Sequence, residues 1–373
     1  MMKRSILPAA LLFMVLTSFC THPAGSPAQA ATPEPDTTQV TMLVAGDLMQ
    51  HIGQVNAALQ GDGTYNYDYV FELVKPEVSR ADVAIANFEV TLGGKPYTGY
   101  PCFSAPDEYL GAAVDAGFDI LLTANNHCCD RRAKGLERTI QLMDQARVPH
   151  LGTYMNADER AKSYPMLYEK NGIRFVLLNF TYGTNGIPVP KPFVVNWQDT
   201  TEIARDIAKA KTMQPDVIIA FPHWGIEYAQ LPNEEMRQLT DWMLARGVDH
   251  VIGGHPHVLQ PFEVREQNGE KHLVAYSLGN YVSNQSRPNT DGGGMVKLVF
   301  TKIGDKTRLT SSGYTLHWVS RPAISGKKNY RIYPIGYPTD KMNAQERALR
   351  QKFINSQRTL FEKHNKGIKE YVY

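Results

Sequence analysis

Short apolar runs alternate with amphipathic segments along the chain from residue 39 onwards. Five of the runs have the length of buried strands: Val40–Ala45, Val83–Ala86, Ile120–Thr123, Val217–Phe221 and Val248–Ile252. Three of the segments between them carry apolar residues at helical spacing: Leu136–Ala146, Thr200–Thr212 and Glu234–Arg246. Gly247 directly follows the last of these, a position at which glycine commonly ends a helix. The alternation predicts an α/β fold built around buried strands.

The pattern changes from residue 261, where strand-like runs follow one another with Gly-rich turns between them. These runs are Pro261–Glu266, His272–Ser277, Met295–Lys302 and Arg308–Val319. We therefore expect a mostly antiparallel second sheet, not a second independent domain. A polar helix is predicted from Asn343 to His364. The main domain is thus expected over residues 39–325, followed by a C-terminal extension with this helix over residues 326–373.

The N-terminal segment has the features of a signal peptide over residues 1–30. A basic start, Met1–Arg4, precedes the apolar stretch Ile6–Phe19, which is short for a transmembrane span. Export to the periplasm or cell envelope is therefore expected, with cleavage after Ala30 and a Pro-rich linker over residues 31–38. Cys20 ends the stretch "LTSFC", so lipid anchoring at this cysteine is the alternative form of export.

Composition and charge are those of a soluble globular protein with a large core. The chain of 373 residues is 43% hydrophobic and 20% charged, with a net charge of +2. The near-neutral charge and the absence of a long basic block argue against a nucleic-acid partner. The one local basic cluster contains Arg131 and Arg132, which either form a solvated turn or help to hold an anionic substrate.

Three cysteines remain after the predicted cleavage: Cys102, Cys128 and Cys129. Because export permits disulfide formation, we expect Cys102 to pair with Cys128 or with Cys129. The alternative is that the two adjacent cysteines ligate a metal, although the chain lacks a C-x-x-C spacing.

Polar side chains that bind metals or transfer protons follow each of the five apolar runs. In chain order they are Asp47 and His51, Glu89, Asn126 and His127, His223, and His255 and His257. Ligands of open α/β sheets bind at the carboxyl ends of the strands, so these side chains are expected to meet at one place. Each has a structural alternative when taken alone, for example a turn at Asp47 or a packed core histidine at His223. Buried together without partners they would cost several kcal/mol, which coordination would offset.

The ordered set of motifs resembles a known family. The motifs are Gly-Asp, Asn-x-Glu, Asn-Asn-His, His-Trp-Gly-x-Glu, Gly-His-Pro-His and Ser-Leu-Gly-Asn. In this order they resemble the bacterial capsule synthesis family CapA, the poly-γ-glutamate biosynthesis proteins, which is itself similar to the calcineurin-like metallophosphoesterases. The resemblance covers about residues 40–290. It implies a four-layer αββα sandwich of the metallo-dependent phosphatase type, with the site at the sheet ends.

The resemblance also implies a ligand set, carried over residue by residue. Its metal ligands are Asp47, Glu89, Asn126, His223, His255 and His257. It places His127 beside the metals as a general acid. One or two ions of manganese, iron or zinc suit these mixed nitrogen and oxygen donors. Glu89 stands where the phosphoesterases carry a bridging Asp, and His51 follows Asp47 by four residues, so both a single site and a second site completed by His51 remain open.

Four further residues are candidates for support of the ligands or the substrate. They are Asn125, Glu227, Ser277 and Asn280. Glu227 follows His223 by four residues and would orient an imidazole through a hydrogen bond. A plain packing or turn role is the alternative for each of them.

Two hypotheses about function follow. The first is an exported metal-dependent hydrolase in which a metal-activated water attacks a phosphoester or a γ-glutamyl amide of an anionic envelope polymer. Asp47, Glu89 and His127 would then be the catalytic residues. The second is a non-catalytic assembly or export factor with a metal-stabilised binding surface, acting in a capsule synthesis complex at the membrane.

Overall fold

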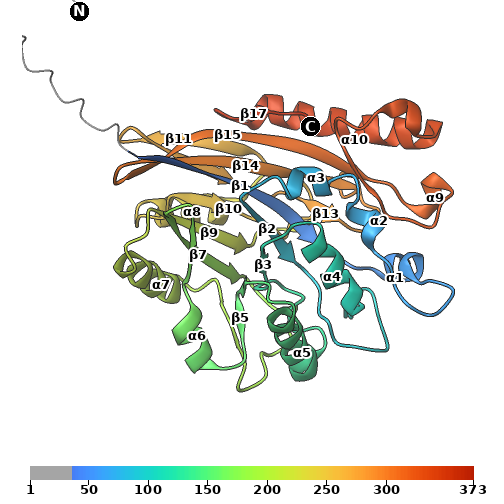
Figure 1. The fold of residues 1–373 in the computed structure, drawn as a ribbon, viewed down its shortest axis with the longest axis horizontal. Helices are drawn as coiled ribbons and strands as arrows, with labels where there is room; N and C mark the ends of the chain where they lie inside the picture. Colours follow the sequence, from blue (N-terminus) through green and yellow to red (C-terminus); the bar gives the residue numbers. More distant parts are fainter. Residues whose placement is uncertain (1–35) are drawn as a thin grey trace, which may run out of the picture. The chain divides into compact units, whose positions relative to one another are not determined.

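Two mixed β-sheets pack face to face, and helices cover their outer faces (Figure 1). The computed structural model describes residues 36–373, which form one compact unit. The predicted signal peptide and Cys20 lie outside the described residues. The architecture is the four-layer αββα sandwich implied by the resemblance.

The first sheet contains nine strands. Its main path runs in the order β16 (Ile332–Pro334), β15 (Lys306–Val319), β14 (Gly292–Ile303), β1 (Thr37–Leu48), β2 (Val83–Phe88), β3 (Ile120–Leu122) and β4 (His150–Leu151). Off this path, β13 (Asn280–Val282) pairs with β1, and β17 (Lys369–Glu370) pairs with β15. Because β1, β2 and β3 are parallel, their carboxyl ends lie at the same edge of the sheet.

The second sheet contains six strands. Their order is β11 (Phe262–Gln267), β12 (Glu270–Ala275), β10 (His250–Ile252), β9 (Val217–His223), β7 (Ile173–Thr181) and β6 (Met166–Lys170). The strands β10, β9 and β7 are parallel, whereas β11 and β6 run antiparallel to their neighbours. A separate two-stranded pair joins β5 (Thr153–Tyr154) to β8 (Val194–Val195).

The side chains of β1 show how one strand serves two cores. Val40, Met42 and Val44 belong to the cluster that also contains the inner faces of the second sheet. Leu43 and Ala45 belong to the cluster formed with the helices of the opposite face. Since successive side chains of a strand point to opposite faces, a continuous apolar run is what a strand buried on both sides requires.

The outer layers are formed by helices on each side. The first sheet is covered by α1 (Ile52–Ala58), α2 (Asp68–Phe71), α3 (Lys75–Val78), α4 (Asp107–Asp115) and α5 (Arg132–Gln145). The second sheet is covered by α7 (Thr200–Thr212) and α8 (Glu234–Leu244), and α6 (Ala157–Ser163) lies nearby (Figure 1). Within residues 36–373, no helix combines the length and apolar character needed to cross a membrane.

The predicted C-terminal helix is confirmed as α10 (Ala344–His364), capped by Asn343. It follows the short α9 (Pro322–Ser325) and packs against β15. The ring of Phe361 lies 4.8 Å from that of Phe262 and 4.9 Å from that of Tyr314, between centroids. The helix therefore covers apolar side chains from both sheets.

The predicted antiparallel second sheet is wrong as stated. The hairpin of β11 and β12 joins the second sheet, because β12 pairs in parallel with β10. The hairpin of β14 and β15 instead joins the first sheet, because β14 pairs with β1 from Thr37 to Ala45. The alternation of apolar and polar residues identifies a strand, but it does not specify which neighbour the strand pairs with. The prediction also omitted β6 and β7.

Candidate metal centre

Six of the predicted ligands meet at the carboxyl ends of strands from both sheets. They are Asp47, Glu89 and Asn126 from the first sheet, and His223, His255 and His257 from the second. Each of these six residues is at most 2% exposed. The alternation of strand and polar residue in the sequence therefore corresponds to a real convergence in space.

Asp47 reaches the centre through a close approach of two backbone segments. Its N–H donates to the carbonyl oxygen of Gly279 at 3.0 Å. A Cβ at Gly46 would lie 2.0 Å from that same oxygen, so no larger residue fits there. On the other side, a Cβ at Gly254 would lie 2.6 Å from Oδ1 of Asp47. The glycines next to the ligands are thus required by packing around the carboxylate.

The two carboxylates of the centre lie among imidazoles and one amide. Oδ1 of Asp47 accepts a hydrogen bond from Asn87 Nδ2 at 2.7 Å, and Oδ2 lies 3.4 Å from Nδ1 of His257. Oε1 of Glu89 lies 3.6 Å from Nε2 of His223 and 3.7 Å from Nε2 of His257. Glu89 is therefore positioned between the groups supplied by the second sheet.

Glu89 is one of two members of the centre that have an unpartnered buried atom. Its Oε1 is buried and has no hydrogen-bond partner. Burial, followed by the neighbouring charge of Asp47, raises the pKa of Glu89 well above its ordinary value. A carboxylate in this position needs a positive partner in order to remain ionised.

Two of the imidazoles, those of His223 and His255, are held in the neutral form that binds metals. Burial lowers the pKa of His223 and of His255 well below the ordinary value, and the neighbouring imidazoles act in the same direction. Nδ1 of His255 is buried without a hydrogen-bond partner. Nε2 of His223 lies 2.9 Å from Oδ1 of Asn126, so this amide oxygen faces the same space.

The residues fit one or two divalent transition-metal ions. Two sets of donor atoms each lie within 4.8 Å of one another: Glu89, His255 and His257, and Asp47, Glu89 and His223. Both sets contain Glu89, as expected of a carboxylate that bridges two ions. Imidazole nitrogens mixed with carboxylate oxygens suit manganese, iron or zinc. The unpartnered Oε1 of Glu89 and Nδ1 of His255 are the atoms that such ions would satisfy.

His127 lies beside the centre and belongs to neither donor set. Its Nδ1 is 2.8 Å from Oδ2 of Asp130, which also accepts from the N–H of Phe103 at 2.7 Å. The ring of Phe103 packs edge-on against His127 at 4.5 Å. Since Asp130 occupies Nδ1, Nε2 is left as the nitrogen for proton exchange. Asp130 was not predicted, although its position three residues after His127 in a turn is a usable signal.

His51 lies next to the centre, outside both donor sets. It begins α1 as the N-cap, and its Nδ1 lies 3.3 Å from Oε1 of Gln54 and accepts from the N–H of Asn284 at 3.4 Å. Burial lowers the pKa of His51 to about 4. Its role as a ligand of a second metal stays a prediction.

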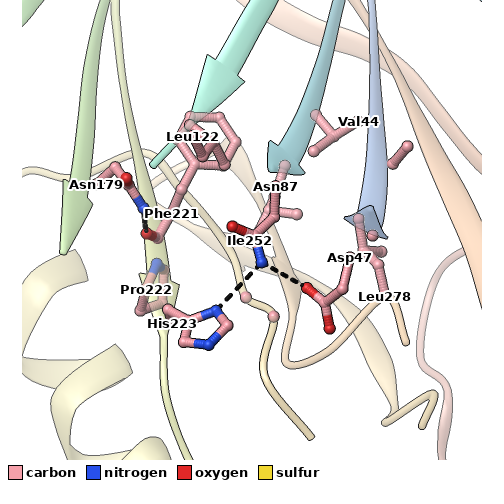
Figure 2. Close-up of a pocket in the computed structure, with 14 residues that line it drawn as sticks. Val44, Asp47, Asn87, Leu122, Asn179, Phe221, Pro222, His223, Ile252 and Leu278 are labelled. Carbon is pink, nitrogen blue, oxygen red and sulfur yellow. Dashed lines mark hydrogen bonds between the residues drawn. The ribbon is translucent and has the colours of Figure 1, made fainter. Parts of the chain in front are cut away.

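Asn87 is a central residue that the sequence reasoning did not select. Figure 2 shows it between Asp47 and His223, at the wall of a cavity of about 20 Å³. Its Nδ2 lies 2.7 Å from Asp47 Oδ1, 3.3 Å from Glu89 Oε2 and 3.2 Å from His223 Nδ1. Asn125 donates to Oδ1 of Asn87 at 3.3 Å, so a second amide orients the first. Asn87 opens the Asn-x-Glu motif, which is the signal that could have identified it.

The other supporting candidates differ in their placement. Asn280 Oδ1 lies 3.1 Å from Nδ1 of His257, so this amide orients an imidazole of the centre. Ser277 donates to the carbonyl of Val258 at 2.8 Å and holds the turn after the histidines. Glu227 is exposed, and its side chain bonds with that of Tyr228 rather than with His223.

The two arginines of the basic cluster flank the start of α5. Arg131 is the N-cap residue, and its guanidinium donates to Thr98 Oγ1 at 3.4 Å. Arg132 is exposed and has a φ of 53°. The structure does not bring either guanidinium into contact with the ligands, and a role in substrate binding stays a prediction.

The predicted disulfide is not formed: Cys102, Cys128 and Cys129 are all free thiols. Cys102 is exposed in the loop before α4, whereas the adjacent cysteines are buried in a small apolar cluster. The loop that contains Cys102 does lie beside the turn after His127, because the N–H of Phe103 donates to Oδ2 of Asp130. The thiol of Cys102 is nevertheless exposed, whereas those of Cys128 and Cys129 are buried. The Sγ atoms of Cys128 and Cys129 lie 3.8 Å apart.

Comparison with known proteins identifies sequence relatives. The family described as bacterial capsule synthesis protein PGA_cap matches residues 41–285. The "Capsule biosynthesis protein CapA" of Bacillus anthracis is 30% identical over 273 residues, which cover 69% of this chain and 63% of that protein. The "PGA biosynthesis protein CapA" of Bacillus subtilis is 29% identical over 249 residues, covering 64% of this chain and 62% of that protein. The chain thus spans less than two thirds of the length of these curated relatives.

Two of the solved structures that align with the chain are a nucleotidase and a phosphoesterase. NAD nucleotidase (NadN) of Haemophilus influenzae aligns with a TM-score of 0.48 at 12% identity, covering 91% of this chain and 65% of that chain. The calcineurin-like phosphoesterase YfkN of Bacillus subtilis aligns with a TM-score of 0.43 at 15% identity, covering 87% of this chain and 100% of that chain. Because the family matches residues 41–285, the chain belongs to the bacterial capsule synthesis protein family.

Proposed function

We propose that the protein is an exported metal-dependent hydrolase that acts on an anionic polymer of the cell envelope. The observation that carries the proposal is the pair of unpartnered, buried atoms Glu89 Oε1 and His255 Nδ1 within one cluster of donors. Leaving such groups unsatisfied costs several kcal/mol, and bound cations would remove that cost. A cluster of this kind at the ends of two sheets is a site for metal ions.

Asp47, Glu89, His223, His255 and His257 would hold the metal ions, together with Asn126. The ions would supply a bound water of lowered pKa and would polarise the bond under attack. Asn87 and Asn280 orient the ligands through their amide groups.

His127 would act as the general acid. Its Nε2–H would donate a proton to the leaving oxygen or nitrogen as the bond to that atom breaks. Asp130 accepts from Nδ1–H, which fixes the tautomer and the orientation of the ring. Burial of this pair excludes bulk water, because His127 is 3% and Asp130 is 5% exposed.

The bond cleaved would be a phosphoester or a γ-glutamyl amide. The family name and the description of the Bacillus subtilis relative as a PGA biosynthesis protein favour a role in making or trimming a capsule polymer. The predicted signal peptide would direct this activity to the periplasm or envelope, where a capsule synthesis complex at the membrane would supply the substrate.

The test combines metal analysis with a substrate panel. Protein comprising residues 31–373 would be purified without chelator, supplied with manganese, iron or zinc, and analysed for metal content. Hydrolysis would then be measured on phosphoesters and on γ-glutamyl peptides. We expect one or two bound ions and turnover of at least one class. Protein that stays metal-free disproves the centre, and metal-loaded protein that only binds the polymer disproves the hydrolase in favour of an assembly factor.

A further inference from the structure

A second cavity shares no lining residue with the metal centre. It measures about 420 Å³ and is enclosed by the loop over residues 283–291, α9 and α10. Three cationic side chains line it: Arg287 from the loop, Arg321 before α9 and Lys352 from α10. Asp291 is the one carboxylate in the lining, so the cavity carries a net charge of +2, three cations less one anion.

The cations of this cavity lack anionic partners in the described part of the chain. Arg321 is half-buried, whereas Arg287 and Lys352 are exposed. Most other half-buried arginines in residues 36–373 are paired with a carboxylate, as Arg160 is with Asp206 at 2.7 Å. Arg321 has a buried Nε without a hydrogen-bond partner. Asp291 forms no ion pair with Arg321, and its Oδ2 accepts from the indole N–H of Trp318 at 2.9 Å. Unpaired like charges that converge on one space repel each other unless an anion enters.

The cavity is connected to the metal centre through the loop over residues 283–291. Asn280, which contacts His257 at 3.1 Å, also donates to Gln285 Oε1 and to the carbonyl of Thr290, both at 2.9 Å. One amide therefore holds an imidazole of the centre on one side and the loop on the other. On the far side, Gln357 of α10 donates to Asn289 Oδ1 at 2.9 Å.

An aromatic side chain lies between the two sites. The guanidinium carbon of Arg287 is 4.5 Å from the ring centroid of Tyr228. The same ring lies 6.2 Å from that of His257. The side chains of His257, Tyr228 and Arg287 thus follow one another in space from the metal ligands to the cationic cavity. A substrate that extends beyond the centre would meet these groups in that order.

We propose that this cavity binds an anionic group, a carboxylate or a phosphate, of an extended substrate whose reacting bond lies at the metal centre. The proposal rests on the proposed function, and it adds a second site on this chain, apart from the metal centre, for a charged group of that substrate. Arg321 and Arg287 supply planar guanidinium groups suited to either anion, and Lys352 adds a point charge. The cavity would then select for long polyanions over small neutral esters or amides.

The experiment measures binding without turnover. Metal-loaded protein is titrated calorimetrically with hexaglutamate, with tripolyphosphate and with uncharged hexaglutamine. We expect one of the two anions to bind and hexaglutamine not to bind. Arg321→Gln and Lys352→Gln should each weaken anion binding about tenfold, since each removes one charge-assisted contact. Lys306→Gln, an exposed residue at the turn between β14 and β15, makes the same charge change away from the cavity and should leave binding unchanged.

The outcomes are separable. Tighter binding of hexaglutamate identifies a carboxylate site, and tighter binding of tripolyphosphate a phosphate site. The proposal is overturned if neither anion binds, if the cavity variants bind like the wild type, or if Lys306→Gln weakens binding equally. Lys352 is exposed, so its variant tests the cavity even if Arg321→Gln does not fold. A protein that binds through the cavity but hydrolyses nothing would refute the hydrolase and leave only the anion-binding cavity standing, and hydrolysis without binding through the cavity would refute the cavity alone.

Discussion

At the residue scale, the candidate centre separates groups that would hold metal from a group that would transfer a proton. Asp47 and Glu89 contact the imidazoles of the second sheet, whereas His127 contacts Asp130. The strand-end pattern predicted that these groups meet, because parallel strands bring their carboxyl ends to one edge. It did not find Asn87 or Asp130, because an amide inside a strand and an acid inside a turn have ordinary structural roles at most positions.

The first prediction concerns His127 and Asp47. His127→Ala should retain metal and lose turnover by about 10² to 10⁴, the usual effect of removing a general acid. Asp47→Ala should lose both metal and turnover, because it removes a ligand and leaves Glu89 and the imidazoles less satisfied. Metal stoichiometry and rate are measured for both variants. Equal metal loss in the two would place His127 among the ligands.

The second prediction concerns Asp130. Asp130→Asn keeps the shape and an oxygen acceptor for the N–H of Phe103, but removes the negative charge beside His127. We expect turnover to fall about 10- to 100-fold, as for other residues that orient a functional side chain, with metal content unchanged. A variant with wild-type turnover would show that Asp130 has only a structural role.

At the scale of elements, boundaries were predictable where local chemistry sets them. The helix predicted over Thr200–Thr212 is present with those bounds, because Asp199 accepts hydrogen bonds from the N–H groups of Thr201 and Glu202. The partner of each strand was not predictable, because the alternation of side chains that marks a strand is the same whichever strand lies beside it. The two C-terminal hairpins show this, because each completes a different sheet.

The third prediction tests the cap of α10. Asn343 Oδ1 accepts from the N–H of Glu346 at 2.8 Å, and Glu346 Oε2 accepts from the N–H of Asn343 at 3.0 Å. Asn343→Ala removes half of this capping box and should lower the free energy of unfolding by about 1 kcal/mol. Urea denaturation provides the measurement, and Asn355→Ala, on the exposed face of the same helix, is the control. A larger loss in the control would contradict the assignment.

At the scale of the whole molecule, the two sheets share one core, and buried histidines make its stability depend on pH. His250 in β10 accepts a hydrogen bond from the N–H of Leu273 at 2.9 Å, which requires a neutral ring. Burial lowers the pKa of His250 from 6.5 to about 3. The unfolded chain therefore binds a proton that the folded chain does not, and the stabilising contribution is present above pH 6.5 and lost as the pH falls towards the folded value.

The fourth prediction follows from this loss of stability as the pH falls. Between pH 7.5 and pH 5, the loss contributed by His250 should amount to about 2 kcal/mol. His250→Asn keeps an acceptor and removes the titration, so its free energy of unfolding should fall less than that of the wild type over this range. His364→Asn, partly exposed at the end of α10, is the matched control. Urea titrations of chelator-treated protein at the two pH values give the comparison, and parallel losses in wild type and His250→Asn would refute the assignment.

The ligands of the candidate centre come from both sheets, three from each. Ions held there would act as a clamp across one end of the sandwich, in addition to any part in the reaction. Because ligands that bind the folded state raise its stability by mass action, removing the metal should lower the melting temperature. The same removal should accelerate amide exchange at the carboxyl ends of β1 and β9 more than at their amino ends. The local stability of this end of the sandwich would therefore depend on the supply of metal ions around the protein.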